Sequence, residues 1–324
     1  MRVAFDSRPA ADPRGIGRYT RSLLAALREE AEARGGSVVE AARHRGADCF
    51  HTPWIDGALL RPRAPVVVTV HDLVPLKRPG EYLRSGLRFR MRYLAVERST
   101  RLIVPTHVVA ADAVELLHVT GDRIDVIPEA ADPAFHPRSD DEVARVRARH
   151  KLPEQYLVWV GGLRHPDPRK RVAALADTAR EMPLVLVGDP GQWARELDDV
   201  ILTGAVSDDE LAAIYTGAHA LVFPSDDEGF GLPTVEALAC GTPVVACDVP
   251  ALREVLGDRA TFVDCDDLDA LLEAAAAARR PAPEPPDWTW ADAARATWDS
   301  YQKACEQSAG GSSSTARARR RERL

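Results

Sequence analysis

Cysteine is scarce in this chain, and the few cysteines form no recognisable pattern. The 324 residues contain five, at positions 49, 240, 247, 265 and 305, with no CxxC pair and few histidines near them. An odd number without metal-ligand spacing argues against both a disulfide framework and a structural zinc site. Unpaired cysteines are typical of a reducing compartment, so we expect a cytoplasmic protein.

Long apolar runs and a strong charge of one sign are also missing. No run approaches the roughly 20 apolar residues that a membrane-spanning helix needs. Met1 to Phe5 leads directly into Asp6 and Arg8, which leaves no room for the apolar part of a signal peptide. With 42 Lys+Arg against 49 Asp+Glu, the net charge is −7. These features exclude transmembrane and secreted classes, and they disfavour a nucleic-acid-binding protein, which is more often basic.

What the chain does have is two series of short apolar runs that alternate with helical spacing. Hydrophobic residues make up 45% and charged residues 28%, a composition that fits about two globular domains at this length. Near-continuous apolar strands separated by helices predict parallel sheets, and hence an α/β fold. We place the domain boundary at residues 150/151. The expected strands are 2–5, 66–70, 102–104, 124–127, 156–160, 184–187, 200–202, 220–223, 243–246 and 260–263.

Two composition changes mark the end of the chain. Residues 279–287 are Pro-rich and predict a stiff connector. The helical spacing of 288–305 then predicts a helix that is able to dock back on the first domain. Residues 307–324 are Gly/Ser-rich and then Arg-rich, so we expect a disordered basic tail there.

The segment Glu228-Gly-Phe-Gly-Leu-Pro-Thr-Val-Glu236 carries the most chemical information. It follows the buried run 220–223, and we expect Thr234 to cap a helix whose first turn contains Glu236. A Gly-rich strand-to-helix loop offers backbone N–H groups and a positive helix end to an anion. An acidic residue in such a fold binds the two hydroxyls of a ribose. Taken alone, the loop is equally a tight turn between strand and helix.

The acidic run Asp226-Asp227-Glu228 offers a second interpretation, a metal-binding motif. We favour carboxylates in a polar loop, with Glu228 as the functional one. His71 and Asp72 follow a Val-rich run, so both lie where ligands bind in open α/β sheets. A histidine in such a place is as often structural as functional.

Taken together, the motifs resemble those of retaining glycosyltransferase family four. The Glu228–Glu236 segment matches its signature of two glutamates separated by seven residues. The resemblance implies the GT-B fold: two Rossmann-like domains with parallel sheets facing a cleft, and a C-terminal helix that crosses back to the first domain. The supporting segments are 15–19 (GIGRY), 70–73 (VHDL), 124–128, 161–170, 203–211, 218–225, 237–246 and 288–301.

The resemblance also implies roles for individual residues. Glu236 would bind the ribose, and Glu228 would lie beside the donor sugar. Arg164 and Lys170 would clamp the diphosphate and stabilise the charge that develops on it, whereas Arg169 and Arg171 are interpreted as solvated. His71 would contact the donor sugar or a developing charge, and Asp72 would orient it or the acceptor. Backbone amides for the donor would come from Gly15, Gly17, Gly229, Phe230, Gly231 and Leu232.

Three features depart from the family pattern. The interval between the first helix and His51 is short, which suggests that one βα unit is missing. Glu129 stands where Asn-Gly is common, so no family role transfers to it. Thr106 replaces a frequent serine but keeps the hydroxyl.

The segment 82–99 predicts an amphipathic helix with an apolar face that includes Met91. Arg84, Arg88 and Arg92 form a cationic stripe beside it. The stripe is either an ordinary solvated surface or an acceptor-side surface drawn to anionic lipid or a lipid diphosphate, which would add peripheral contact with the inner face of the membrane.

These observations predict a metal-independent retaining hexosyltransferase that needs no cofactor beyond its nucleotide-sugar co-substrate. GDP-mannose is the first donor expected, because the GIGRY and HDL segments resemble the mannosyltransferase branch. UDP- and dTDP-sugars remain open, as do glycan, lipid-linked and small-molecule acceptors. A non-catalytic nucleotide-sugar sensor is an alternative. So is an epimerase or phosphorylase of the same fold, which would need acid/base carboxylates or a cofactor-binding lysine.

Overall fold

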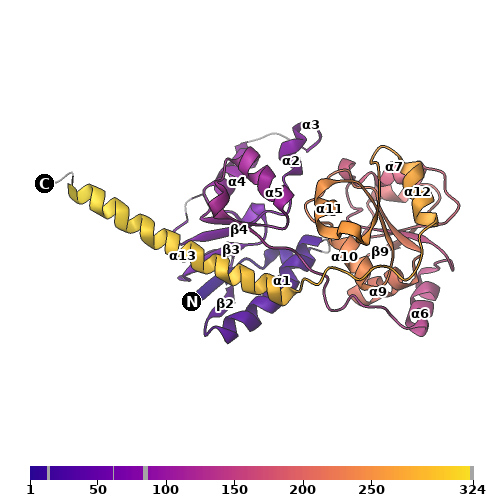
Figure 1. The fold of residues 1–324 in the computed structure, drawn as a ribbon, viewed down its shortest axis with the longest axis horizontal. Helices are drawn as coiled ribbons and strands as arrows, with labels where there is room; N and C mark the ends of the chain where they lie inside the picture. Colours follow the sequence, from indigo (N-terminus) through magenta and orange to yellow (C-terminus); the bar gives the residue numbers. More distant parts are fainter. Residues whose placement is uncertain (13–14, 61, 83–86, 322–324) are drawn as a thin grey trace. The chain divides into compact units, whose positions relative to one another are not determined.

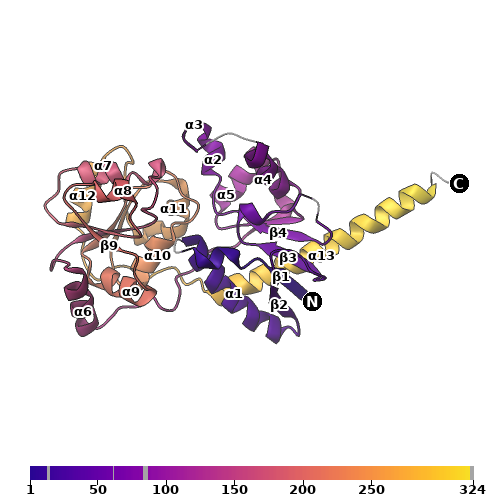
Figure 2. The same cartoon turned by 180° about the vertical axis from the view of Figure 1, so that it is seen from behind.

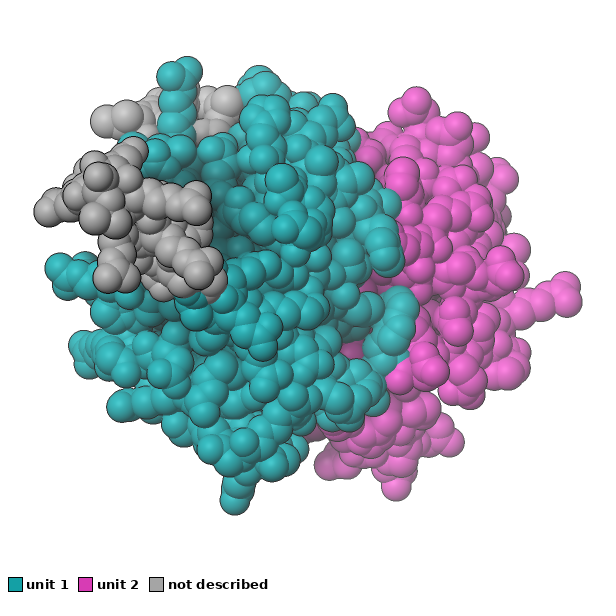
Figure 3. All heavy atoms as spheres, turned by 60° about the vertical axis from the view of Figure 1, so that its left-hand side comes forward, with its two compact units in different colours: residues 1–129, 288–324 teal, residues 130–287 magenta. Residues whose placement is uncertain are grey.

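The computed structural model describes residues 1–12, 15–60, 62–82 and 87–321, with the side chains of 87–89 and 310–321 left out. The chain divides into two compact units, coloured separately in Figure 3. Unit 1 comprises residues 1–129 and 288–324, and unit 2 comprises residues 130–287. The first unit therefore contains both ends of the described chain, and the second is a continuous segment between them.

Unit 1 is built on a six-stranded parallel sheet with the strand order β2-β1-β3-β4-β5-β6. Two of its strands were not expected from the sequence, β2 and β3. Residues 41–48 join these two strands without a helix, in the interval that the sequence shows to be short. The strands are β1 (Arg2–Phe5), β2 (Ser37–Glu40), β3 (Cys49–Thr52), β4 (Val66–Thr69), β5 (Arg101–Val104) and β6 (Ile124–Val126).

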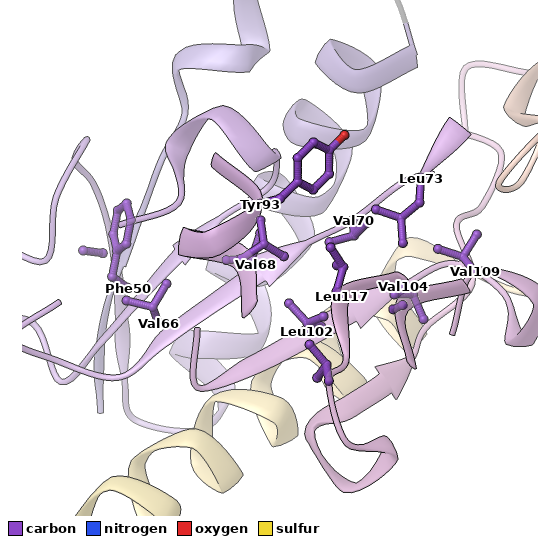
Figure 4. Close-up of a cluster of buried hydrophobic side chains, with 14 of the residues drawn as sticks. Phe50, Val66, Val68, Val70, Leu73, Tyr93, Leu102, Val104, Val109 and Leu117 are labelled. Atoms are coloured by element: carbon purple, nitrogen blue, oxygen red, sulfur yellow. The ribbon is translucent and has the colours of Figure 1, made fainter. Parts of the chain in front are cut away.

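Helices cover both faces of this sheet. Because side chains alternate along a strand, Phe50, Val66, Val68 and Leu102 point to one face, where they pack with residues of α4 and α5 (Figure 4). The opposite face is covered by α1 and α13, which lie side by side in Figures 1 and 2. The helices are α1 (Gly15–Ala33), α2 (Val74–Lys77), α3 (Pro79–Tyr82), α4 (Leu87–Glu97), α5 (His107–Leu117) and α13 (Trp290–Arg321), with short 3-10 helices at Arg8–Ala11, Ile55–Gly57 and Gly121–Arg123.

The helix α13 returns to unit 1 after the Pro-rich connector, which confirms the crossing-back helix of the predicted fold. Its inward side is buried as far as Ala304. Beyond that point the helix continues to Arg321, where the sequence predicts a disordered tail. Alanine and arginine are strong helix formers and are frequent in 316–321, in contrast to the Gly/Ser-rich residues before them.

The predicted helix 82–99 is shorter than expected and buries different residues. Tyr82 ends α3 and α4 extends over Leu87–Glu97, while residues 83–86 lie outside the described residues. Met91, expected on the apolar face, is 38% exposed, whereas Tyr93, Ala95 and Val96 are buried against the sheet. The predicted apolar face was therefore wrong at Met91.

Unit 2 contains the second six-stranded parallel sheet, with the order β12-β11-β10-β7-β8-β9. Numbered from its own first strand, this is the order 3-2-1-4-5-6 of a doubly wound nucleotide-binding domain. The strands are β7 (Leu157–Val160), β8 (Leu184–Val187), β9 (Val200–Gly204), β10 (Ala220–Phe223), β11 (Val244–Cys247) and β12 (Thr261–Val263). The helices are α6 (Asp140–His150), α7 (Val172–Asp177), α8 (Gln192–Arg195), α9 (Asp208–Gly217), α10 (Leu232–Ala239), α11 (Pro250–Leu256) and α12 (Leu268–Ala276), with 3-10 helices at Pro168–Lys170 and Gly257–Arg259.

The boundary between the units lies at residues 129/130, not at 150/151 as the sequence predicted. The reason is that α6 packs on α9 of unit 2. Arg138, just before α6, pairs with Asp209 at 2.7 Å, and Arg149 pairs with Glu210 at 2.9 Å. These charged contacts, rather than apolar periodicity, assign the helix to the second unit.

Candidate functional site

The strand order of unit 2 identifies one edge of its sheet as the place for a ligand. β7 and β10 are neighbours, but their following connections leave in opposite directions. In open α/β sheets the ligand binds outside the carboxyl ends of the strands at such a switch point. The two segments that emerge there are 161–171 and 224–231, the same segments that the sequence singled out.

Glu228 lies at the centre of this edge and is almost fully buried, with 8% of its side chain exposed. Lys170 Nζ lies 3.4 Å from its Oε1, and Arg169 Nη1 lies 3.8 Å from its Oε2. Burial alone raises the pKa of Glu228, but the charges of Lys170 and Arg169 outweigh it and lower the net pKa. The carboxylate is therefore held ionised between two cations.

The two segments are also joined through their backbones. The N–H of Asp226 donates to the carbonyl of Arg169 at 3.0 Å, and the ammonium of Lys170 lies 5.9 Å from the centre of the Phe223 ring. Arg169 is largely buried, so its interpretation as a solvated side chain was wrong. Arg171 is also half-buried, with a left-handed backbone (φ 49°) that starts α7. Three cationic side chains thus belong to the folded edge.

Arg164, predicted to share the clamp with Lys170, points elsewhere in the structure. Its side chain is 74% exposed and forms an ion pair with Asp189, with Nε 3.1 Å from Oδ2. The structure therefore brings Lys170, Arg169 and Glu228 together, and it leaves Arg164 at the exposed rim after β7.

The start of α10 differs from the predicted cap. Gly231 is the N-cap residue, with φ +87°, a conformation that favours glycine. A side chain at Gly231 would also collide with Leu252, since its Cβ would lie 2.6 Å from Cδ2. Thr234 lies inside the first turn, where its hydroxyl donates to the Gly231 carbonyl at 2.7 Å. Gly229, Phe230 and Leu232 are all buried.

Glu236 lies one residue beyond the first turn of α10, not within it as predicted. Its side chain has no exposed surface, and the hydroxyl of Tyr215 donates to Oε2 at 3.3 Å. A carboxylate in this position binds a ribose only if a covering group moves aside. Tyr215 is a partner that the sequence did not reveal, because it comes from α9.

In unit 1, His71 follows β4 and has both ring nitrogens engaged. Nδ1 lies 2.9 Å from Oε1 of Glu129, and Nε2 lies 2.9 Å from the carbonyl oxygen of Pro53. Burial alone lowers the pKa of His71, but Glu129, the Pro53 carbonyl and Asp72 together raise the net pKa. Glu129, to which the sequence gave no role, is therefore the direct partner of a predicted site residue.

The other predicted residues of unit 1 have structural contacts. Asp72 Oδ1 accepts from the N–H of Val74 at 3.2 Å, at the start of α2. Gly15 and Gly17 lie in the first turn of α1 rather than in a loop. A Cβ on Gly17 would lie 1.8 Å from the carbonyl oxygen of Asp12, so glycine is required there by the neighbouring backbone. Thr106 caps α5 by accepting from the N–H of Val109.

A charged cluster that the sequence did not predict lies at the carboxyl ends of β1 and β3. The fully buried Asp6 accepts from Arg8 Nη2 at 2.7 Å, from Trp54 Nε1 at 3.0 Å and from the hydroxyl of Thr52 at 3.4 Å. An acidic residue directly after the first strand was the signal available in the sequence. This cluster fixes an arginine and a tryptophan at the edge of the unit 1 sheet.

Of the predicted cationic stripe, only Arg92 is described with its side chain, and it pairs with Asp56 at 2.8 Å. Arg84 and the side chain of Arg88 lie outside the described residues. Within the described chain, no helix is long and apolar enough to cross a membrane. The described side chains also contain no group of three or more His, Cys, Asp or Glu arranged to hold a metal ion.

Two models of known protein families together match most of the chain. The model for Glycosyltransferase Family 4 matches residues 33–135, and the model for Glycosyl transferases group 1 matches residues 154–279. The first match falls almost wholly in unit 1, and the second lies entirely in unit 2. They confirm the resemblance that the sequence motifs indicated.

Among curated relatives, the chain is 29% identical over 230 residues to the O-antigen chain mannosyltransferase B of Escherichia coli. The alignment covers 63% of this chain and 58% of that protein, so the chain spans little more than half of that relative's length.

Solved structures show the same fold over nearly the whole chain. Sucrose-phosphate synthase from Thermosynechococcus elongatus has a TM-score of 0.66 at 20% identity, covering 98% of this chain and all of that one. The Anabaena protein HepE, in a structure with UDP-glucose, has a TM-score of 0.66 at 16% identity, covering 97% and 100%. With the two parallel sheets described above, these neighbours confirm the predicted GT-B fold.

Proposed function

Since the chain belongs to the glycosyltransferases, with a family 4 domain and a group 1 domain, we propose that it transfers a sugar from a nucleoside-diphosphate sugar to an acceptor hydroxyl. The observation that carries this proposal is the edge of the unit 2 sheet, where Lys170 and Arg169 flank Glu228 at the switch point. Two cations beside a strand-to-helix loop suit a diphosphate.

Within this proposal, Lys170 stabilises the leaving group. Negative charge grows on the diphosphate as the bond from the sugar C1 to the diphosphate oxygen breaks, and a preorganised cation lowers the energy of that state. Arg169 replaces Arg164 as the nearer second cation, because Arg164 is exposed and paired with Asp189. The role of Arg164 is then to bind the outer part of the donor.

Glu228 and the loop after β10 hold the donor. The carboxylate of Glu228 accepts hydrogen bonds from sugar hydroxyls, and the amides of 229–232 donate to hydroxyls and diphosphate oxygens. Glu236 binds the ribose after the side chain of Tyr215 releases it, since this carboxylate is buried in the structure. For His71, on unit 1, we keep the role that the family resemblance implies, contact with the donor sugar or a developing charge.

We further propose that the anomeric configuration is retained and that no metal is needed. The leaving diphosphate takes the proton of the acceptor hydroxyl on the same face of the sugar, as the new bond to C1 forms there. This mechanism needs no separate base. It agrees with the described edge of unit 2, where the carboxylate of Glu228 is paired with Lys170 and Arg169.

GDP-mannose is the proposed donor, on the strength of the mannosyltransferase relative and the family motifs. UDP-glucose is the specific alternative, because a structure of the same fold holds it. The acceptor belongs to glycan, lipid-linked or small-molecule chemistry.

Calorimetric titration of GDP, UDP and dTDP into the protein and into Lys170→Ala tests the proposal. Binding of one nucleotide, weakened at least tenfold in the variant, supports the donor class and the clamp. The matched control is Lys151→Ala, which removes an exposed lysine of the same unit and leaves binding unchanged. Absence of binding to all three nucleotides would contradict the proposal and favour an altered site. Product anomers by NMR, with and without EDTA, then test retention and metal independence.

A further inference from the structure

The two hydrogen-bond partners of His71 determine the protonation state of its ring. Its Nδ1 faces a carboxylate oxygen of Glu129 and its Nε2 faces the backbone carbonyl of Pro53, both at 2.9 Å. Neither a carboxylate nor a carbonyl can donate a hydrogen bond. Both contacts are therefore hydrogen bonds only if both ring nitrogens carry a proton, which makes the ring an imidazolium.

We propose that Glu129 is a positioning residue that keeps His71 doubly protonated, so that His71 acts in sugar transfer as a fixed cation and not as a proton acceptor. This inference rests on the proposed transferase function. It assigns a role to a residue where the family commonly has Asn-Gly. Neither of those two residues would supply the negative charge that this geometry uses.

The environment supports a stable ion pair. Only 5% of the Glu129 side chain and 22% of the His71 side chain are exposed, so water screens the pair weakly. An opposite charge within about 4–6 Å favours the charged form of a histidine and raises its pKa. The raised pKa of His71 agrees with this geometry.

The other titratable groups near His71 do not compete for its protons. From α1, the ring of Tyr19 packs edge-on against the imidazole, with centroids 4.5 Å apart. Burial raises the pKa of this phenol, so it stays neutral. From β3, His51 is buried, and burial together with the charge of His71 lowers its pKa to about 3. Asp72, the neighbour in sequence, adds a further negative charge that favours the protonated ring.

The pair also fixes the connection after β3. The Nε2–H of His71 holds the Pro53 carbonyl, and the next residue, Trp54, is held by Asp6 through its indole N–H. Loss of one proton from His71 removes one of its two hydrogen bonds. The charge of His71 and the position of the connection after β3 therefore both depend on whether His71 carries its second proton.

The test follows His71 by NMR and by kinetics in the full chain. The ¹⁵N shifts of the His71 ring, assigned with His71→Asn, distinguish an imidazolium from a neutral tautomer. The same pH series is recorded for Glu129→Gln and Glu129→Asp. We expect His71 to titrate above the ordinary value near 6.5, and Glu129→Gln to lower the pKa of His71 measurably. Glu129→Asp keeps a carboxylate and restores part of the shift.

The pH dependence of kcat/KM is measured on the same proteins. On the alkaline side of the profile, the fall in kcat/KM (the alkaline limb) should follow the titration of His71 and move to lower pH in Glu129→Gln. The matched control is Glu115→Gln, an exposed carboxylate on α5, which leaves both the limb and the shifts unchanged.

Two results would overturn the inference. One is a ring nitrogen of His71 that lacks a proton at neutral pH, and the other is an alkaline limb that stays in place while the pKa of His71 falls. If no donor supports transfer, the proposed function fails, while the NMR titration still decides the charge of His71. If Glu129→Gln does not fold, the wild-type ¹⁵N shifts and Glu129→Asp decide it.

Discussion

In unit 2 the buried carboxylate of Glu228 lies at the carboxyl edge of the sheet, beside Lys170 and Arg169. In unit 1 some of the buried polar side chains lie instead across the face of the sheet that α13 covers. There the hydroxyl of Tyr301 lies 2.6 Å from His51 Nδ1, and His51 Nε2 lies 2.9 Å from the Thr69 hydroxyl. If the proposed function is right, unit 2 uses its buried polar groups for a ligand, whereas unit 1 uses several of its own to hold a returning helix.

The largest expected effect is that of Lys170→Ala on turnover. Removing a cation from the developing charge should lower kcat/KM by about 10³-fold. Glu228 keeps Arg169 as a partner, so the free energy of unfolding should fall by about 1 kcal/mol or less. Steady-state kinetics and denaturant unfolding measure the two quantities. If the free energy of unfolding fell as much as the activation free energy rose, Lys170 would serve the fold of unit 2 as well as turnover, and the contrast with unit 1 would be lost.

Asp125→Asn should act on stability instead. Arg101, only 4% exposed, donates to both oxygens of Asp125, at 2.7 and 3.0 Å. Leaving this guanidinium without its anion should lower the unfolding free energy by about 3 kcal/mol at neutral pH.

The pH dependence of this effect has a defined sign. Burial alone raises the pKa of Asp125, but Arg101 and Lys303 lower the net pKa below its unfolded value near 3.9. The stabilisation is therefore complete above about pH 4 and is lost as the pH falls through the folded pKa. The difference between wild type and Asp125→Asn in urea unfolding should shrink in that range. A difference that stays constant down to pH 2 would contradict the assignment.

Tyr301→Phe should have a smaller effect of the same kind. It removes one hydroxyl and leaves a nitrogen of the buried His51 without a partner, which should cost about 1–2 kcal/mol. Thermal unfolding of the full chain measures it, with nucleotide binding as the control. A variant that binds nucleotide more weakly but unfolds as before would mean that this network serves the ligand after all.

The smallest effect is expected from Lys303→Ala. This lysine is 53% exposed and pairs with Asp125 at 2.8 Å, so water and salt screen the interaction. The unfolding free energy should change by less than about 1 kcal/mol, and the change should decrease further in high salt. A loss as large as that of Asp125→Asn would show that α13 depends on its rim charges more than on its buried side.

The candidate edge of unit 2 could be predicted because its residues lie in two short stretches of sequence, 161–171 and 224–236. The role of Arg169 could not, because the loop folds back and brings its side chain to Glu228. The position of Glu236 relative to the helix start depended on Gly231 taking the cap that Thr234 was expected to form.

The site of unit 1 was less predictable for a physical reason. His71 follows β4 and Glu129 follows β6, so their contact depends on strands that are not neighbours in the sheet. β2 and β3 were missed because Ser37–Glu40 and Cys49–Thr52 interrupt their apolar residues with polar ones. In β3 one of those residues is His51, whose partner Tyr301 comes from the far end of the chain.

The return of α13 to unit 1 has a consequence for how the protein is made. Trp298 and Tyr301 are among the largest fully buried side chains, and they cover a face of a sheet whose first strand begins at Arg2. A ribosome therefore completes all of residues 130–287 before it supplies the helix that closes unit 1. Unit 2 is free to fold early as a continuous segment, while the face around His51 and Thr69 stays open until the last turns emerge. The chain therefore most needs protection from aggregation during the part of its synthesis in which this face of unit 1 is still uncovered.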